Sequence, residues 1–186
     1  MPSPELTLLS LVGSTRVGSV NAAVSRAVQR QPPPGVRVVD HPLKGVPFYD
    51  GDVEAAGLPD EVVALREAVD AADGVVFFSP EYNGSYPAVT KNAIDWLSRP
   101  TGEGPINRAA ITMVSASPGP RQGAGVRDHF AAVMPRVSGR IFGETFGIGP
   151  YPPLLDEAGE LSDQATIDGL SDFLARFATH VESSAP

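Results

Sequence analysis

Hydrophobic residues along the chain fall into short continuous runs that alternate with amphipathic stretches. The runs occupy residues 7–13, 36–40, 74–79, 109–117 and 140–148. Continuous apolar runs of this length are typical of β-strands that are buried on both faces. The stretches between them place apolar residues at helical spacing, with polar residues on the opposite side. We therefore expect strands and helices to alternate along the whole chain.

Five amphipathic helices are predicted between and after these strands. In the first, Val20, Val24 and Val28 fall on one stripe, and the prolines that follow cannot continue a helix. The fourth is expected to stop near Pro135 for the same reason. The predicted helices cover residues 19–30, 58–73, 88–98, 125–137 and 166–181.

This order of elements predicts an α/β fold. Five continuous apolar strands separated by helices indicate a parallel sheet that is covered on both faces. The arrangement expected for such a chain is flavodoxin-like, a doubly wound five-stranded parallel sheet with strand order 2-1-3-4-5. No internal repeat or linker interrupts the pattern, so residues 1–186 are expected to form a single domain.

In sheets of this type, ligands bind beyond the carboxyl ends of the strands, where the winding reverses. The segments after the first, third and fourth predicted strands are "GSTRVGSVN" at 13–21, "SPEYNGSYP" at 79–87 and "SPGPRQGAG" at 117–125. These are the most irregular segments of the chain. We expect them to meet at one edge of the sheet and to form one ligand site.

The first of these segments has the features of a phosphate-binding loop. It joins a buried strand to a helix whose first N–H groups lack partners and carry partial positive charge. Ser14, Thr15 and Ser19 supply hydroxyl groups, Arg16 supplies a cation, and Asn21 can cap the helix or donate. The alternative is that the segment only caps the helix, for which one Ser would suffice.

Other phosphate and nucleotide sites do not match the sequence. The loop lacks the Lys of a Walker motif, and no Gly-x-Gly is completed to the dinucleotide fingerprint. The chain contains no cysteine, which excludes a Cys-dependent phosphatase, disulfides and thiolate metal sites. It also lacks the acidic residues of a receiver domain and the Gly-x-Ser-x-Gly elbow of a hydrolase.

Composition and charge narrow the possible partners. The chain is 42% hydrophobic and carries a net charge of −8, with scattered basic residues, which argues against nucleic-acid binding. No apolar run approaches the roughly 20 residues that span a bilayer, and no secretory signal is evident. The three histidines show no ligand spacing, so no metal site is expected. These features predict a cytoplasmic protein without a nucleic-acid or membrane partner.

Two motifs together resemble a known family. "LVGSTRVGSVN" at 11–21 and "PEYNGSYPAVTKNAIDWLSRP" at 80–100 are similar to the NADPH-dependent FMN reductase family, specifically its chromate, quinone and azo reductase branch. The resemblance covers essentially the full chain, including "SASPG" at 115–119. The departures are mild, and one of them is Thr90, where the family commonly has Leu.

The resemblance implies that FMN is the cofactor and indicates which residues bind it. The phosphate contacts would come from the first loop, and the other contacts from the segments after the third and fourth strands. The residues implied are Ser14, Arg16, Ser19, Val20, Asn21, Pro80, Glu81, Tyr82, Asn83, Gly84 and Ser117.

The second loop has properties that suit a flavin ring. Asn83 and Gly84 tolerate positive φ and favour a turn, so we expect the amides of residues 81–85 to line the ring edge. Donors at that edge would stabilise the reduced, anionic ring. Tyr82 is expected beside the ring. The alternatives are a rigid loop that only packs and, for Glu81, an acceptor for a nearby backbone or a neighbouring subunit.

The implied activity is an FMN-dependent NAD(P)H oxidoreductase of the FMN or quinone reductase type. We expect a ping-pong reaction in which NAD(P)H reduces FMN at N5 and leaves, after which a quinone, flavin, azo compound or chromate takes the electrons. No catalytic acid or base is expected. The alternatives are a flavodoxin-like FMN electron carrier and a flavin-bound signalling protein with little turnover.

The helix predicted at 88–98 bears on assembly. Lys91 and Asp95 have the spacing of a helix ion pair. Ile94, Trp96 and Leu97 suit either the core or a subunit interface, and the resemblance implies a homodimer or homotetramer.

Overall fold

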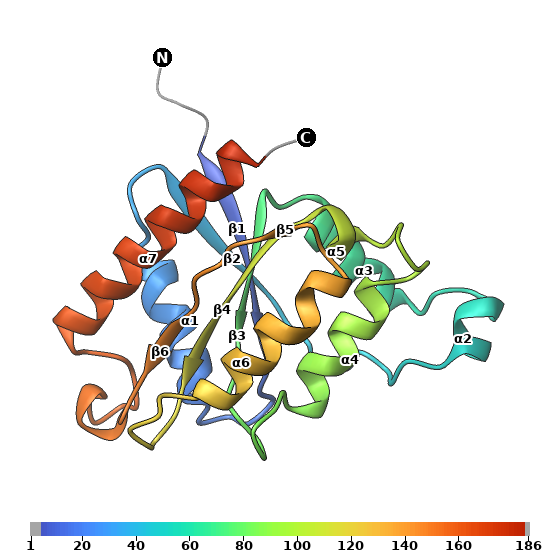
Figure 1. Cartoon of the computed structure of the whole chain (residues 1–186). Coiled ribbons are helices and arrows are strands. Elements are labelled where there is room, and N and C mark those ends of the chain that lie inside the picture. The colour runs from blue at the N-terminus through green and yellow to red at the C-terminus, as the bar shows by residue number, and fades with distance from the viewer. Residues whose placement is uncertain (1–4, 185–186) are drawn as a thin grey trace.

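The computed structural model describes residues 5–184, and a parallel six-stranded sheet lies at its centre. The strands follow the order β2-β1-β3-β4-β5, with β6 also beside β4, which confirms the predicted flavodoxin-like winding (Figure 1). The first four and last two residues of the predicted domain lie outside the described part. The strands are β1 (Leu6–Val12), β2 (Val36–His41), β3 (Gly74–Phe78), β4 (Ala110–Ala116), β5 (Arg140–Ile141) and β6 (Phe146–Ile148).

Helices cover both faces of this sheet. α1 and α7 lie on one face, and α3, α4 and α6 lie on the other (Figure 1). All five predicted helices are present, and the fourth ends before Pro135 as expected. Two short helices, α2 and α5, were not predicted. The helices are α1 (Val20–Arg30), α2 (Gly51–Ala56), α3 (Asp60–Asp70), α4 (Ala88–Leu97), α5 (Pro105–Arg108), α6 (Ala124–Val133) and α7 (Gln164–Ser183).

The central strands are buried on both faces, which explains their continuous apolar sequences. On β3, Val76 and Phe78 pack in the cluster beneath α1 and α7. Val75 and Phe77 pack in the cluster beneath α3, α4 and α6. Because successive side chains of a strand point to opposite faces, one unbroken apolar run serves both cores.

The prediction of one continuous strand over residues 140–148 is wrong, because the structure divides this segment into β5 and β6. Ile141 lies beside Ile111 of β4, whereas Phe146 lies beside Val114, so the edge chain takes two more residues than β4 over the same distance. The extra residues bulge away from regular pairing. Thr112 of β4 donates its hydroxyl to the carbonyl of Glu144 at 2.9 Å and so satisfies part of the interrupted ladder.

On α4, the structure resolves the alternatives that the sequence left open. Ile94, Trp96 and Leu97 are at most 2% exposed within one chain, so they belong to the core and not to a subunit interface. Lys91 and Asp95 form the predicted ion pair at 2.5 Å.

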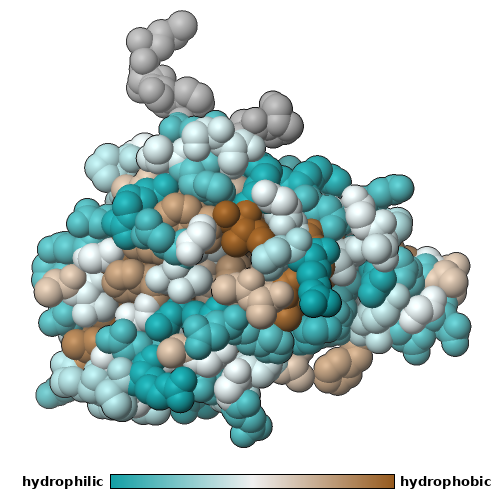
Figure 2. All heavy atoms as spheres, viewed as in Figure 1, coloured by the Kyte–Doolittle hydropathy of each residue, from teal (hydrophilic) through white to brown (hydrophobic). Residues whose placement is uncertain are grey.

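The outer surface is mainly hydrophilic on the face drawn in Figure 2, in keeping with the net charge of −8. Helix α2 lies apart from the sheet at one end of the molecule and buries none of its residues (Figure 1). Between residues 5 and 184, no helix combines the length and apolar character needed to cross a bilayer.

Candidate functional site

The three irregular segments meet at the carboxyl edge of the sheet, as predicted. They enclose a cavity of about 330 Å³, which we call the three-loop cavity. Nine of the eleven residues predicted to bind FMN line it, and only Asn83 and Gly84 do not. The lining residues are Ser14, Arg16, Ser19, Val20, Asn21, Pro80, Glu81, Tyr82, Ala116, Ser117, Pro118 and Tyr151.

The start of α1 forms one wall of this cavity. Ser19 is the N-cap, and its hydroxyl accepts from the N–H of Ala22 at 3.3 Å. The alternative interpretation, in which this segment caps the helix, therefore holds for Ser19. This cap uses the N–H of Ala22 and leaves the N–H groups of the two preceding residues available to a ligand. Val20 and Asn21 follow in the first turn, where backbone N–H groups have no intrahelical acceptor. These groups and the Arg16 side chain give the wall the character of an anion site.

The Asn21 side chain is hydrogen-bonded to the end of β4. Its Nδ2 donates to the carbonyl of Ala116 at 3.2 Å, and its Oδ1 accepts from the N–H of Ala116 at 3.0 Å. The side chain is 1% exposed, so both of its polar atoms are committed to the end of β4. Asn21 therefore joins two loops of the site, and only its backbone N–H remains for a ligand.

Gly13 lets the first loop start close to its neighbours. Its N–H donates to the carbonyl of Phe78 at 2.8 Å. A Cβ at Gly13 would lie 2.0 Å from Oγ1 of Thr90, which is itself fully buried and 3.3 Å from Oγ of Ser79. Thr90, the departure from the family pattern, thus packs directly against the start of the loop after β1.

The predicted turn at Asn83 and Gly84 is confirmed, with φ of 54° and 75°. Tyr82 and Ser85 exchange two backbone hydrogen bonds of 3.0 Å across it, which makes a two-residue hairpin. The expected row of free amides is therefore wrong for Tyr82 and Ser85, because the hairpin uses their N–H groups. The turn residues themselves lie at the exposed tip, outside the cavity.

Glu81 takes the alternative role that the sequence left open. Its Oε2 accepts from the N–H of Val126 in the first turn of α6 at 3.3 Å. Gly125 permits this approach, because a Cβ there would lie 3.0 Å from the carboxylate. The N-cap of α6 is Gly123, which has no side chain to offer, so Glu81 supplies the missing acceptor from another loop.

His129, also on α6, holds the other end of the same hairpin. Its Nδ1 lies 2.7 Å from Oγ of Ser85, and its ring stacks on Tyr86 with 4.7 Å between ring centroids. Burial raises the pKa of Tyr86, so its hydroxyl stays neutral. One face of α6 therefore positions the loop that carries Pro80, Glu81 and Tyr82.

Tyr151 completes the three-loop cavity and was missed by sequence reasoning. It comes from the segment after β6, and its N–H donates to the carbonyl of Ser117 at 3.3 Å. Gly149 lies so close that a Cβ there would be 2.5 Å from the same carbonyl. No phosphate or flavin motif surrounds Tyr151. Only the pairing of β6 with β4 brings it to the site.

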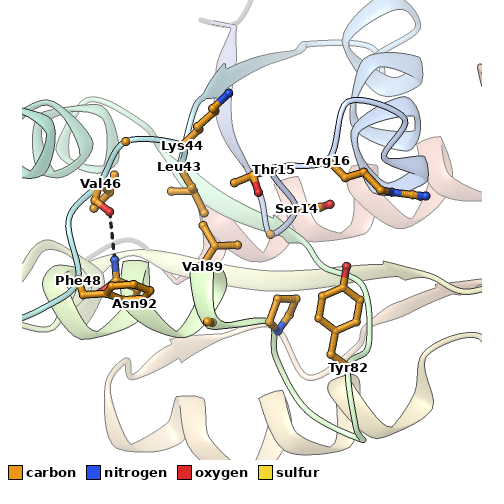
Figure 3. A pocket seen from close by; sticks show the side chains of 14 residues that line it. Ser14, Thr15, Arg16, Leu43, Lys44, Val46, Phe48, Tyr82, Val89 and Asn92 are labelled. Carbon is orange, nitrogen blue, oxygen red and sulfur yellow. Dashed lines mark hydrogen bonds between the residues drawn. The ribbon is translucent and has the colours of Figure 1, made fainter.

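A larger cavity of about 650 Å³ adjoins the first (Figure 3). We call it the neighbouring cavity. It shares Ser14, Arg16 and Tyr82 with the three-loop cavity, and its far wall is the segment after β2, which sequence reasoning did not single out. The other residues that line it are Gly13, Thr15, Leu43, Lys44, Gly45, Val46, Phe48, Pro87, Ala88, Val89 and Asn92.

The donor set of the three-loop cavity fits FMN. The helix start and Arg16 suit a phosphate dianion, and the rings and apolar surfaces of Pro80, Tyr82, Pro118 and Tyr151 suit a flat aromatic group. The two chemistries lie in one cavity, which is the arrangement a flavin mononucleotide requires.

Comparisons with known proteins agree with this fit. The sequence model for NADPH-dependent FMN reductases matches residues 6–151. The chain is 34% identical over 184 residues to quinone reductase from Escherichia coli K12, covering 97% of each chain. It is 40% identical over 117 residues to an NAD(P)H-dependent FMN reductase from Pseudomonas aeruginosa, covering 63% of each. Among solved structures, the flavoenzyme NAD(P)H:(acceptor) oxidoreductase FerB from Paracoccus denitrificans matches with a TM-score of 0.82 and 27% identity, covering 96% of this chain and 98% of that one.

Proposed function

Because this chain belongs to the NADPH-dependent FMN reductase family, we propose that it passes electrons from NAD(P)H to a quinone through FMN held in the three-loop cavity. The chain is an FMN-dependent NAD(P)H oxidoreductase. One observation carries the assignment of the site, namely that nine predicted FMN contacts from separate segments line a single cavity.

The phosphate end of FMN belongs at the start of α1. The N–H groups of Val20 and Asn21 point their partial positive charge toward an anion there, and Ser14 and Arg16 add a hydroxyl donor and a full charge. In this proposal Ser19 acts chiefly as the cap that keeps these two N–H groups in place.

The flavin ring belongs beside Pro80, Tyr82, Ser117 and Tyr151. Bound FMN supplies the redox chemistry, a two-electron transfer from NAD(P)H to the acceptor. The protein binds and orients the reactants. Glu81 and Asn21 act indirectly, since their side chains hold α6 and β4 in register with the loops. No side chain is assigned as a catalytic acid or base.

The test is a turnover assay with the FMN-loaded protein, NADPH and a soluble benzoquinone. We expect continuous loss of NADPH absorbance that requires the quinone under anaerobic conditions. An FMN electron carrier or a signalling flavoprotein would be reduced at most once per FMN and would then stop. A single turnover under these conditions would therefore reject the reductase proposal.

The acceptor can be ranked in the same assay. Quinone is placed first because the E. coli relative, which the chain matches over nearly its full length, is named a quinone reductase. Free flavin, an azo dye and chromate remain the other acceptors of the proposal. A kcat/KM for quinone below that for any of these three would change the assignment.

Assembly and location complete the proposal. We place the enzyme in the cytoplasm as a homodimer or homotetramer, with no role for nucleic acid or membrane. Two features support assembly: Phe48 is 76% exposed at the rim of the neighbouring cavity, and α2 buries none of its residues within one chain. Sedimentation equilibrium checks this, and a monomer at micromolar concentration would contradict it.

A further inference from the structure

The hairpin after β3 is small, and its orientation depends on other parts of the chain. Tyr82 and Ser85 form a single isolated bridge, and the tip between them is exposed. A lone two-stranded hairpin is at best marginally stable in water. This hairpin nevertheless carries Tyr82, which borders both cavities and is 55% exposed. The position of the Tyr82 ring is therefore set by whatever holds the hairpin in place.

The first two turns of α6 hold both ends of the hairpin, at the edge of the sheet where α6 begins (Figure 1). Before the turn, Glu81 accepts from the N–H of Val126 at 3.3 Å. After the turn, Oγ of Ser85 lies 2.7 Å from Nδ1 of His129. Residues three positions apart lie on one face of a helix, so a single face of α6 makes both contacts.

The imidazole of His129 is fixed in the direction of Ser85. Its ring stacks on Tyr86 with 4.7 Å between the ring centroids and an angle of 23° between the ring planes. Tyr86 is 7% exposed and packs in the core cluster beneath α3, α4 and α6. His129 thus contacts two consecutive residues of the chain, one by stacking and one by a hydrogen bond. Together these contacts tie the second strand of the hairpin to the core.

We propose that His129 is a positioning residue for FMN, which acts through the Ser85 hydroxyl to keep the hairpin in the orientation that FMN requires. The inference rests on the proposed placement of FMN in the three-loop cavity, whose wall includes Pro80, Glu81 and Tyr82. His129 lines neither cavity, so its effect on FMN is indirect. A hairpin that leaves this orientation is competent to bind for only part of the time, and the apparent Kd rises as that fraction falls.

The test compares His129→Ala with His129→Asn by titration of FMN into the apoproteins. Both changes remove the ring that stacks on Tyr86, but Asn keeps a polar atom bonded to Cγ, as Nδ1 is, and its amide can donate to a hydroxyl or accept from one. His129→Ala is expected to raise the Kd for FMN roughly three- to tenfold, the scale of one neutral hydrogen bond. His129→Asn should recover most of this loss.

The same two variants are then measured in combination with Ser85→Ala. Once the hydroxyl is removed, Asn should bind FMN no better than Ala at position 129, because the contact that Asn preserves has lost its partner. An advantage of Asn that disappears with Ser85→Ala supports the proposal. Equal Kd values for His129→Ala and His129→Asn when Ser85 is present overturn it, since a loss of packing alone affects both variants alike. An advantage of Asn that persists in Ser85→Ala overturns it as well.

Asp128→Ala is the matched control, because Asp128 is exposed on the same helix, directly before His129. Its Kd for FMN should stay within about twofold of the wild type, as for an exposed residue. A rise as large as that of His129→Ala would trace the effect to the helix as a whole and overturn the proposal.

FMN titration also separates this inference from the proposed function. It needs no turnover, so the expected pattern of Kd values supports the role of His129 even if quinone reduction fails. Weaker binding by Arg16→Ala with unchanged binding by His129→Ala rejects the role of His129 and leaves the FMN site standing. Unchanged binding in both variants rejects the site itself, and the role of His129 with it.

Discussion

At Gly13 the end of β1 runs so close to α4 that there is no room for a side chain. A Cβ on this residue would lie 2.0 Å from Oγ1 of Thr90 and 3.1 Å from Oγ of Ser79. Both neighbours are fully buried, so neither side chain has free space into which to move. The tight start of the loop after β1 thus depends on the absence of one methyl group.

Replacing Gly13 with Ala is therefore expected to lower the free energy of unfolding by about 1–3 kcal/mol, the usual cost of overpacking a core. Gly18→Ala in the same loop is the matched control, because its Cβ would meet no atom within 4 Å. Urea denaturation of the FMN-free proteins measures both. Equal stability of Gly13→Ala and Gly18→Ala would contradict the steric argument.

A double variant identifies the clashing partner. If Thr90 is the obstacle, Gly13→Ala combined with Thr90→Ala should recover part of the lost stability relative to the sum of the two single changes. Strict additivity would show that the strain lies elsewhere. The sequence alone marked Thr90 as a departure from the family, but its contact with Gly13 depends on the fold.

Between elements, Glu81 links the hairpin after β3 to the N-terminus of α6. Its carboxylate accepts from the N–H of Val126 at 3.3 Å, where no side chain of the helix itself provides a cap. Glu81→Ala should therefore cost about 1 kcal/mol, as the loss of an N-cap does, and Glu81→Gln about half of that, since an oxygen acceptor remains.

The same pair of variants tests whether α6 positions the flavin loop. FMN affinity should fall in Glu81→Ala by more than in Glu81→Gln, following the order of the lost helix contact. Fluorescence titration of free FMN into the apoprotein gives the dissociation constants. Equal loss of affinity in both variants would instead indicate that the Glu81 charge acts on the ligand directly.

A second link between elements is sensitive to pH. Glu160, in the segment before α7, accepts from Nε of Arg26 at 2.9 Å and from Nη1 of Arg30 at 3.1 Å on α1. Hydrogen bonding to Arg26 is the main cause that lowers the pKa of Glu160. Its folded pKa lies below the unfolded one, so the stabilisation is complete above the unfolded pKa and is lost as pH falls through the folded pKa.

Glu160→Gln should accordingly lower the free energy of unfolding by about 0.5–1 kcal/mol at neutral pH, the scale of a partly exposed ion-pair network. The difference from wild type should shrink as the pH falls below the carboxyl pKa, because both proteins then carry a neutral side chain there. Urea denaturation over a pH series measures this. A difference that is constant with pH would contradict the electrostatic origin.

The elements themselves were predictable where apolar periodicity was strong. The stripe of Val20, Val24 and Val28 on α1 is buried, as expected. Helix α2 was missed because none of its residues packs on the core, so it has no apolar stripe to detect. The division of 140–148 was missed because a bulge depends on register with β4, which the sequence of one strand does not contain.

For the whole molecule, strand order decided how much of the site was predictable. The winding 2-1-3-4-5 placed the loops after β1, β3 and β4 together, and their motifs were visible in the sequence. The segment after β2 also neighbours that after β1, but Leu43, Lys44 and Phe48 form no recognisable motif. Tyr151 was missed for the same reason. The contacts that the Asn21 and Glu81 side chains make with other segments could not be predicted from the sequence, because they depend on where the folded chain places those side chains.

Because the three-loop cavity is made by segments from across the chain, a ligand in it should stabilise the whole molecule. At a free FMN concentration of 100 times Kd, binding to the folded state alone adds about 2.7 kcal/mol. Arg16→Ala should leave the stability of the apoprotein within about 0.5 kcal/mol, as for an exposed residue, since no ion pair of Arg16 exists among residues 5–184.

Arg16→Ala should nevertheless reduce the stabilisation by FMN, because the phosphate loses its cationic contact. At a fixed FMN concentration, a roughly tenfold rise in Kd removes about 1.4 kcal/mol of the added stability. Thermal unfolding with and without FMN measures the two effects separately. A variant that keeps the full FMN-induced shift in Tm would take Arg16 out of the phosphate site. A variant that loses stability without FMN would show instead that Arg16 supports the fold.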